Sequence, residues 1–330
     1  MLAPAAVVAA TLTLVACSNS NPSSGGGATS GGGGATVTKT VTGSTGAAAS
    51  SSTPAAATSS SAAPKTVVSI TTLNSDGAEY GVGMPVIAFF SRKPVSAKAW
   101  QADTKVTANG KTLKAAWYFE PSSASKKFPY EAHLRPGPRN YWPAHSHIHV
   151  QFPAKGTSLG GNLVSDGKLT SLDFSIGAEH IGLVNNATHT ITITSDGKQV
   201  YKFPVSLGAS NTPTARGVKV IMEKGVSICM TGPGYHECGV KYTQRLTYGG
   251  EYLHAAPWNT TNIRNGVNSS NGCTNLYTDD AKTLYDYLRV GDVVSYPNAN
   301  GPAMSLGAGY GDWNISWSQW LTGGAVSTTT

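Results

Sequence analysis

Two side chains in the C-terminal half could act as a nucleophile and its base. Cys273 stands in the run 269–275, where small and amide residues surround it and Gly272 lets the backbone approach a substrate closely. His254, nineteen residues upstream, ends the strand-like run 250–254. A thiol, an imidazole and a glycine-bearing turn are the groups needed for acyl transfer through a thiolate. Cysteine and histidine also occur together by chance, so residue types alone leave a structural role open.

The N-terminal cysteine indicates export. Cys17 closes a Leu-Val-Ala-Cys run after the apolar segment 5–16, which is the lipobox pattern of a bacterial lipoprotein. The apolar segment is too short for a comfortable membrane-spanning helix. We therefore predict a signal peptide over residues 1–17, with lipidation of the Cys17 thiol. The pattern departs from a usual signal peptide in one respect, since no Lys or Arg precedes the apolar run.

The remaining cysteines, Cys229, Cys238 and Cys273, would then lie in an oxidising compartment. Cys229 and Cys238 are nine residues apart, and the Gly-Pro-Gly turn at 232–234 can bring their β-carbons within bridging range. This pairing leaves Cys273 as an unpaired thiol. A free thiol outside the membrane is a liability unless its chemistry is used.

Composition restricts the partners. The 330 residues carry a net charge of +7, with 12% charged and 40% hydrophobic residues. No basic run reaches five residues, which argues against nucleic-acid binding. Diffuse positive charge suits an anionic surface such as a bacterial wall or lipid headgroups, although ordinary solubility explains it equally well.

Residues 18–65 are Ser, Gly, Ala, Thr and Pro with almost no charge. Such a segment buries too little apolar surface to offset its conformational entropy, so we predict a disordered linker. Its 48 residues would reach roughly 40 Å as a flexible coil, enough to hold a folded part away from a membrane.

Short alternating segments follow from Thr66 and predict β-structure. Strands are expected near 67–70, 86–90, 105–107, 115–119 and 147–152, without a helix, which favours a small β-sandwich over 66–175. A second β set covers 176–206, and 229–238 reads as a lid or as a stapled surface loop. One helix is predicted to begin with Thr278 as its N-cap and to stop at Gly291.

Two clusters have alternative interpretations. His145, His147 and His149 are spaced to share one strand face, where they could bind zinc or copper or form a polar row. No carboxylate or cysteine accompanies them in the sequence, which favours the polar row. Trp313, Trp317 and Trp320 fit packing against the domain better than carbohydrate stacking.

Read in order, these motifs resemble the cell-wall L,D-transpeptidases that carry a bacterial Ig-like domain before the catalytic one. The family motif is a His, 14–17 residues, and then Ser/Thr-His-Gly-Cys-x-Asn; here fifteen residues separate His254 from Ser270. The resemblance covers about residues 66–322, and its segments are 81–86, 141–144, 212–214, 248–258, 270–275 and 311–314.

The resemblance implies a mainly β protein with a defined order of domains. An Ig-like β-sandwich over 66–175 would precede an L,D-transpeptidase catalytic β-sandwich over 176–322 with one or two short helices, and 323–330 would be a disordered tail. It also implies peptidoglycan maturation: the thiol attacks the carbonyl between the diamino acid at stem position three and D-Ala. The acyl group then passes to the side-chain amine of another stem, which gives a 3→3 crosslink without cofactor or metal.

Residue roles also follow from the resemblance. Cys273 would be the nucleophile and His254 the general base, with the backbone carbonyl of Ala255 orienting the imidazole. The backbone N–H groups near Gly272 and Cys273 and at Tyr248 would form the oxyanion hole. Cys229 and Cys238 would staple the active-site flap over 229–238. The implied substrate contacts are Tyr248, Met230, Trp258, Ser270, Asn271 and Asn275.

One departure from the family and three hypotheses remain. Asn271 stands where the family has a second His, so any role that needs a titrating imidazole there is lost. Expected partners are donor and acceptor stem peptides, carbapenem-type inhibitors and, through Cys17, the membrane, with the enzyme facing the wall. The alternatives to a transpeptidase are an L,D-carboxypeptidase that trims stem tetrapeptides and a catalytically weak wall-binding lipoprotein.

Overall fold

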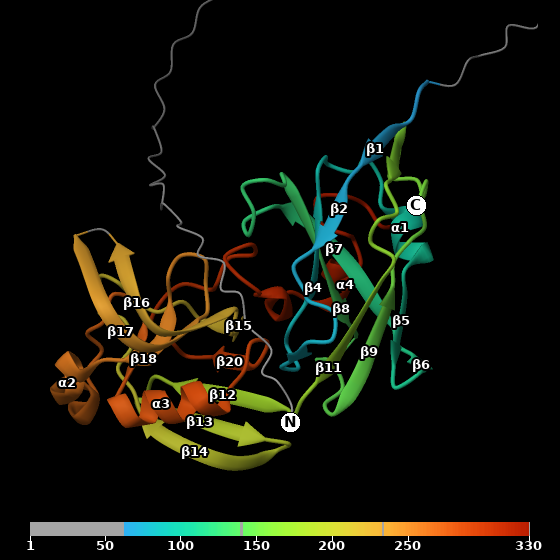
Figure 1. Cartoon of the computed structure of the whole chain (residues 1–330). Coiled ribbons are helices and arrows are strands. Elements are labelled where there is room, and N and C mark those ends of the chain that lie inside the picture. Colours follow the sequence, from blue (N-terminus) through green and yellow to red (C-terminus); the bar gives the residue numbers. More distant parts are fainter. Residues whose placement is uncertain (1–62, 139–140, 233, 330) are drawn as a thin grey trace, which may run out of the picture. The chain divides into compact units, whose positions relative to one another are not determined.

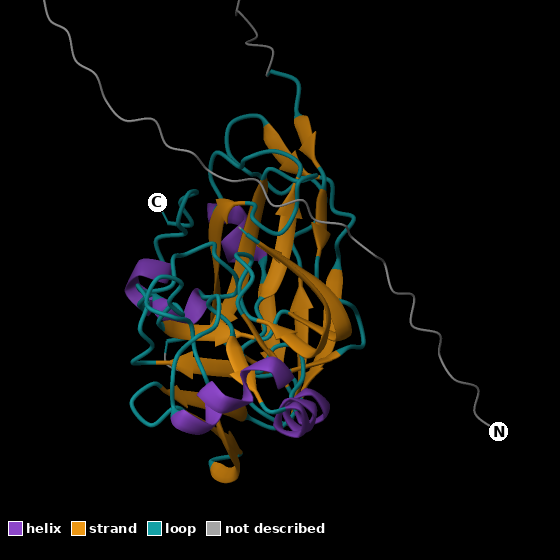
Figure 2. Cartoon of the chain, turned by 90° about the vertical axis from the view of Figure 1, so that its left-hand side faces the viewer, coloured by secondary structure: helices purple, strands orange, loops and turns teal. Residues whose placement is uncertain are grey.

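The computed structural model describes residues 63–138, 141–232 and 234–329. The predicted signal peptide with Cys17, and nearly all of the predicted linker, lie outside these residues. Within them the chain is mainly β, with a few short helices (Figure 2). The mainly β fold class predicted from the sequence is therefore confirmed.

The N-terminal half builds two main sheets that enclose an apolar core. Phe90 of one sheet and Phe174 of the other belong to this core, where Phe90 packs against Trp100 and Phe174 against Trp142. One sheet has the order β2 (Ile70–Thr72), β4 (Val86–Phe90), β8 (Tyr130–Pro136), β7 (Ala115–Pro121). The other has the order β3 (Glu79–Tyr80), β11 (Ser171–Ile176), β9 (Ser146–Gln151), β5 (Lys105–Ala108), β6 (Lys111–Thr112). A small parallel pair joins β1 (Thr66–Val68) to β10 (Leu163–Ser165).

The C-terminal half builds a second pair of sheets. The first has the order β14 (Lys198–Pro204), β13 (Thr190–Ser195), β12 (His180–Asn185), β20 (Val293–Tyr296), β15 (Gly217–Val220). The second has the order β16 (Glu223–Gly232), β17 (Tyr235–Arg245), β18 (Tyr252–Ala255), β19 (Thr274–Leu276). Ile191, Leu253 and Leu284 share one buried core, so helix α3 (Thr278–Tyr287) packs between strands of both sheets (Figure 1).

The helices are short. Besides α3 they are α1 (Lys98–Asp103), α2 (Thr260–Asn265), α4 (Trp317–Trp320) and the 3₁₀ turns η1 (Pro257–Asn259) and η2 (Asp312–Asn314). The sequence did not predict α1, whose six residues give too little periodicity to detect. Helix α3 begins at Thr278 with Tyr277 as its N-cap, and it ends before Gly291 because Leu288 is already extended.

The C-terminal segment returns to the first pair of sheets. The guanidinium of Arg135 stacks on the rings of Trp313, Trp317 and Trp320, at 4.8, 5.4 and 4.5 Å from their centroids. The Trp320 indole also donates to the carbonyl of Ala116 at 2.7 Å. The three tryptophans therefore pack within the fold, as the sequence favoured. Residues 323–329 differ from the predicted disordered tail, because Gly323 and Ala325 hydrogen-bond to the strand around Phe119.

The segment 229–238 is not a loop. Cys229 lies in β16 and Cys238 in β17, and these paired antiparallel strands are joined by the Cys229–Cys238 disulfide. The predicted pairing is confirmed, but the sequence missed the strands because the Gly-Pro-Gly turn breaks their alternation. The staple therefore sits near the tip of a β-hairpin.

Candidate active site

Strand register brings the thiol and the imidazole to one pocket. Strands β18 and β19 are parallel, with Leu253 opposite Thr274 and His254 opposite Asn275. Because alternate residues of a strand face the same side, Cys273, just before Thr274, faces the side of His254 and Asn275. All three line a cavity of about 350 Å³, whose other lining residues are Met230, Tyr235, Glu237, Val240, Trp258, Asn259, Asn262, Ser269, Ser270 and Asn271.

The thiol is buried and unpaired. Cys273 is 6% exposed and is the free cysteine of the described residues. Its Sγ donates to the carbonyl of Gly250 at 3.5 Å. Burial raises the pKa of Cys273 to about 12, although a backbone hydrogen bond from Tyr252 and the charge of Lys219 act in the opposite direction. The resting group is therefore a thiol rather than a thiolate.

The imidazole is fixed by its backbone contact. His254 Nδ1 lies 2.8 Å from the carbonyl oxygen of Ala255, so Nδ1 carries the proton and Nε2 is left as the basic nitrogen. The ring lies nearly parallel to that of Trp258, with centroids 6.0 Å apart. Burial lowers the pKa of His254, which keeps the ring neutral and able to accept a proton. Among the described residues, no hydrogen bond joins His254 to the Cys273 sulfur.

The loop before the thiol is held from both sides. Gly272 has φ +105°, which an L side chain rarely adopts. Thr214 Oγ1 donates to the carbonyl of Gly272 at 2.9 Å, and Ser270 Oγ donates to the carbonyl of Cys273 at 2.6 Å. The N–H of Gly272 donates to Ser270 Oγ at 3.2 Å, whereas the N–H of Cys273 has no acceptor among the described residues. The Cys273 N–H is thus free to donate to a group bound in the cavity.

Tyr248 is placed away from the pocket. Its N–H donates to the carbonyl of Ala308 at 2.8 Å, and its ring packs edge-on against Tyr310. The oxyanion and substrate roles that the resemblance implied for Tyr248 therefore find no geometric support. The tyrosine that lines the pocket is Tyr235, at the start of β17. Burial raises the pKa of Tyr235, so its hydroxyl stays protonated. In the sequence, Tyr235 directly follows the Gly-Pro-Gly turn at 232–234, and this position was the signal that could have pointed to it.

The other implied substrate contacts do reach the cavity. Met230, Trp258, Ser270, Asn271 and Asn275 all line it. Trp258 is 58% exposed, so its ring forms an open wall beside His254. Asn275 Oδ1 is buried without a partner in the described residues, so it is a free hydrogen-bond acceptor beside the cavity.

Two stretches of the chain match two known protein families. Residues 179–295 match the family described as the L,D-transpeptidase catalytic domain, and residues 29–158 match the family described as a bacterial Ig domain. The chain carries an L,D-transpeptidase catalytic domain. This domain defines a family of cysteine transpeptidases, and the stretch matched here contains both Cys273 and His254.

Several known proteins are similar to this chain over about two thirds of its length or more. L,D-transpeptidase 2 of Mycobacterium tuberculosis is 27% identical over 76% of this chain, which spans 60% of that protein's length. The structure of an L,D-transpeptidase from Mycobacterium smegmatis is 27% identical, with a TM-score of 0.52 over 69% of this chain and 98% of that one. A structure of LdtMt1 in complex with imipenem shares the fold at 24% identity, with a TM-score of 0.55 over 68% of this chain and 96% of that one.

A buried ion pair beside the thiol was not predicted. The ammonium of Lys219 pairs with the carboxylate of Glu251 and lies over the ring of Tyr296, 4.0 Å from its centroid. Glu251 also accepts the N–H of Ala215 at 2.7 Å. Lys219 is fully buried, and burial lowers its pKa against the attraction of Glu251. Nothing in the sequence marks these two residues, which lie 32 positions apart, as partners.

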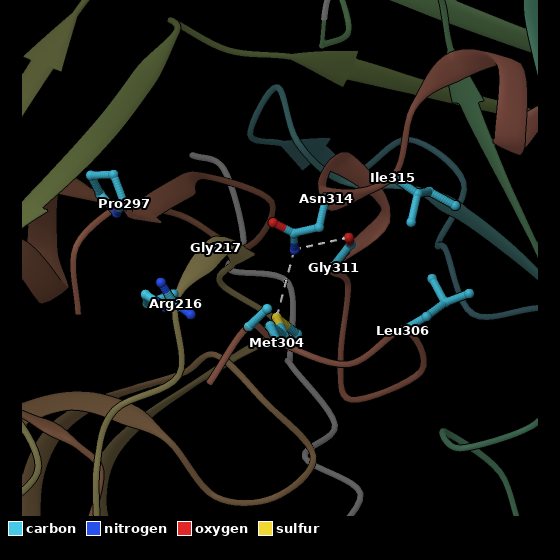
Figure 3. Close-up of a pocket in the computed structure, with 9 residues that line it drawn as sticks. Arg216, Gly217, Pro297, Met304, Leu306, Gly311, Asn314 and Ile315 are labelled. Carbon is cyan, nitrogen blue, oxygen red and sulfur yellow. Dashed lines mark hydrogen bonds between the residues drawn. The ribbon is translucent and has the colours of Figure 1, made fainter. Parts of the chain in front are cut away.

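The described residues contain a second cavity, which shares no lining residue with the one around Cys273. Its volume is about 390 Å³, and it is lined by Arg216, Gly217, Pro297, Ala303, Met304, Leu306, Gly311, Asn314 and Ile315. Figure 3 shows the Asn314 side chain bonded to the carbonyl of Gly311 and near the sulfur of Met304. No nucleophile or base stands among these residues, so this cavity is not the site of acyl transfer.

The three histidines near β9 do not converge on one point. His149 and His147 lie 2.9 and 3.7 Å from the carboxylate of Asp173, whereas His145 lies 3.0 Å from Asp196. Asp173 comes from β11 and Asp196 from the turn between β13 and β14, which is why the sequence around the histidines did not reveal them. The arrangement is an exposed polar row.

No helix among the described residues is long and apolar enough to cross a membrane.

Proposed function

We propose that this chain is a peptidoglycan L,D-transpeptidase that forms 3→3 crosslinks through a thioacyl-enzyme on Cys273. The observation that supports this most is the convergence of Cys273 and His254 on one cavity, with the imidazole tautomer fixed by Ala255. A nucleophile beside an oriented base is the minimal arrangement for acyl transfer. The N-terminal sandwich would act as a spacer that carries this domain toward the wall.

Acylation begins from two neutral groups. Because the pKa of Cys273 is raised to about 12 and that of His254 is lowered, a thiolate–imidazolium pair is not the resting state. The sulfur attacks the stem carbonyl while His254 Nε2 accepts the thiol proton. The S–C bond forms as the carbonyl π electrons move to oxygen, and the Cys273 N–H stabilises that oxyanion.

Collapse of this intermediate breaks the C–N bond to D-Ala. His254 returns its proton to the leaving amine, and a thioester on Cys273 remains. The side-chain amine of a second stem then attacks the thioester, and His254 accepts the amine proton as the S–C bond breaks. His254 passes that proton to the departing Cys273 thiolate, which restores the two neutral groups. Asn275 Oδ1, buried and without a partner among the described residues, would accept an N–H of the bound stem.

A carbapenem tests the nucleophile directly. LdtMt1 has been solved in complex with imipenem, and we expect imipenem to add once to this protein at Cys273. Intact-mass spectrometry should detect one adduct, absent from Cys273→Ala and formed at least about 100-fold more slowly by His254→Ala. His147→Ala, an exposed imidazole on β9, is the matched control and should react at the wild-type rate. An adduct on Cys273→Ala would refute the assignment.

Purified disaccharide-tetrapeptide tests the reaction. A transpeptidase should produce crosslinked dimer with release of D-Ala, whereas a carboxypeptidase should produce only the trimmed tripeptide. Dimer formation that depends on Cys273 supports the proposal. Trimmed product without dimer, over a range of acceptor concentrations, would replace it with the carboxypeptidase activity.

We also propose lipid anchoring through Cys17, with residues 18–65 as the tether. The basis is the Leu-Val-Ala-Cys sequence after a short apolar run. Expression in a bacterial host should place the wild-type chain in the membrane fraction, and Cys17→Ala should move it out. Unchanged fractionation of Cys17→Ala would contradict the anchor while leaving the enzymatic proposal intact.

A further inference from the structure

A buried cluster of titratable side chains lies where the C-terminal segment meets the first pair of sheets. Glu120 comes from β7, Glu131 and His133 come from β8, and Asp312 comes from η2. All four are less than one-tenth exposed. Strands β7 and β8 are adjacent, with Glu120 paired in register to Glu131, so their side chains share one face (Figure 1). The catalytic pocket described above uses none of these residues.

The imidazole of His133 is oriented like that of a metal ligand. Its Nδ1 lies 3.0 and 3.1 Å from the two carboxylate oxygens of Asp312, so Nδ1 donates there. Its Nε2 is buried without a hydrogen-bond partner in the described residues. A carboxylate that fixes one ring nitrogen while the other faces a site is the usual outer-shell arrangement of histidine metal ligands.

Two carboxylates face that unpartnered nitrogen. Nε2 lies 3.6 Å from Glu131 Oε1 and 3.8 Å from Glu120 Oε1. These separations exceed hydrogen-bond distance but approach the about 3.3–3.6 Å between neighbouring ligands of a tetrahedral ion with bonds of about 2.0–2.2 Å. All three candidate ligand atoms lie within 4.8 Å of one another.

The Glu131 carboxylate is itself held in place. Ser122 Oγ donates to it at 2.7 Å, and the N–H of Ala124 donates to the same oxygen at 3.3 Å. The carboxylate of Glu120, by contrast, accepts no hydrogen bond from the described residues. Three carboxylates around a single imidazole leave negative charge in a buried site, and burying such charge is costly unless a cation compensates it.

We propose that Glu120, Glu131 and Nε2 of His133 bind one divalent cation of the Zn²⁺ type, which fastens β7 and β8 to the C-terminal segment through Asp312. One imidazole with carboxylates suits Zn²⁺ better than Mg²⁺ or Ca²⁺, which prefer oxygen ligands alone. The alternative is a proton on His133, and the surrounding carboxylates do raise the pKa of His133 well above its ordinary value. With a proton on His133 Nε2, the contacts from this nitrogen to Glu131 and Glu120 would stay too long for hydrogen bonds. A metal ion between the three atoms would instead bond to all of them.

The test uses the full chain, stripped with a chelator and titrated with ZnCl₂. We expect one Zn²⁺ per chain by elemental analysis and a rise in Tm of about 5–10 °C at one hundred times the Kd, with no rise from MgCl₂. Glu120→Gln, a conservative change at the least enclosed ligand, should weaken Zn²⁺ binding at least about tenfold. Asp312→Asn keeps all three ligands and should weaken it about 10–100-fold.

A matched control removes four other candidate zinc ligands. The quadruple variant H147Q/H149Q/H236Q/C273A lacks the exposed imidazoles of β9 and the hairpin and the active-site thiol. It should still bind one Zn²⁺ with the wild-type Tm rise, and anomalous scattering at the zinc edge should place the ion between Glu120 and His133. Absence of bound Zn²⁺ in the wild-type chain, or its retention in Glu120→Gln with loss in the quadruple variant, would overturn the proposal.

Discussion

Lys219 and Glu251 form a buried ion pair beside the loop that carries the nucleophile. The Cγ atom of Glu251 lies 3.8 Å from the position that a β-carbon on Gly272 would occupy. Lys219 is fully buried, and its charge also acts on the Cys273 thiol. The pair thus links β15 to the start of β18 at the point where the thiol is held.

Removal of one partner should destabilise the domain strongly. Lys219→Met leaves the Glu251 carboxylate, whose side chain is only 16% exposed, without its counter-ion, at a cost of about 2–4 kcal/mol in the free energy of unfolding. Lys219→Met/Glu251→Gln removes both charges and keeps an acceptor for the Ala215 N–H, so it should recover most of that loss. Urea unfolding measures both variants.

The surface pair Lys282–Asp286 on α3 is the matched control. Both side chains are more than half exposed, and solvent screens such pairs. Lys282→Met should therefore leave the unfolding midpoint unchanged. Equal effects of Lys219→Met and Lys282→Met would show that burial does not determine the strength of the Lys219–Glu251 pair.

The pH dependence of acylation should follow His254 rather than the thiol. Burial lowers the pKa of His254 below 6.5, so the neutral base persists at pH 6.5 and the acid limb of carbapenem acylation lies below that value. The Cys273 pKa of about 12 predicts no second rise between pH 8 and 9. Stopped-flow rates from pH 4 to 10 measure this, and a rise centred near 8.5 would instead indicate an ordinary cysteine.

The same imidazole links folding to pH. Its folded pKa is lower than its unfolded pKa, so the unfolded chain binds the extra proton as pH falls. The contribution of His254 to stability is complete above about pH 6.5 and declines as pH falls through the folded pKa. In the His254→Gln variant, which cannot titrate at this position, the loss of stability below pH 6.5 should be smaller.

The sequence predicted what depends on local pattern. Alternation located β9 and β13 because one face of each is buried, and the apolar stripe of Leu284, Tyr285 and Leu288 located α3. The free thiol followed from counting cysteines, because Cys229 and Cys238 pair across adjacent strands. These features are set by residues close together in the chain.

What depends on distant contacts could not be predicted in the same way. The family resemblance implied that Tyr248, which precedes β18, lies in the pocket. Its N–H instead donates to the carbonyl of Ala308, sixty residues away in sequence. Tyr235 reaches the cavity because β17 pairs with both β16 and β18. The Asp312–His133 contact joins residues 179 positions apart, and no local pattern encodes it.

The nucleophile loop should depend on one hydroxyl. Ser270 Oγ donates to the carbonyl of Cys273 and accepts from the N–H of Gly272, so Ser270→Ala leaves two buried backbone groups less well satisfied. We expect a loss of about 1–2 kcal/mol in stability and acylation slower by about tenfold. Ser270→Thr keeps the hydroxyl and should acylate near the wild-type rate; equal defects in both variants would refute the hydroxyl's role.

The disulfide should act on the hairpin rather than on the whole domain. Cys229 and Cys238 close a short loop that includes Met230 and Tyr235, both of which line the cavity. A disulfide that closes a loop of about ten residues disfavours opening of the hairpin by about 2–3 kcal/mol, because it restricts the conformations of the opened chain. Cys229→Ser/Cys238→Ser should therefore speed amide exchange near the tip of β16 and β17. Exchange in β12 and β13 should stay unchanged, because their core does not include the hairpin tip. Carbapenem acylation should slow in the same variant, because Met230 and Tyr235 are no longer held in place. Faster amide exchange throughout the domain would contradict this prediction and would mean that the disulfide supports the whole fold.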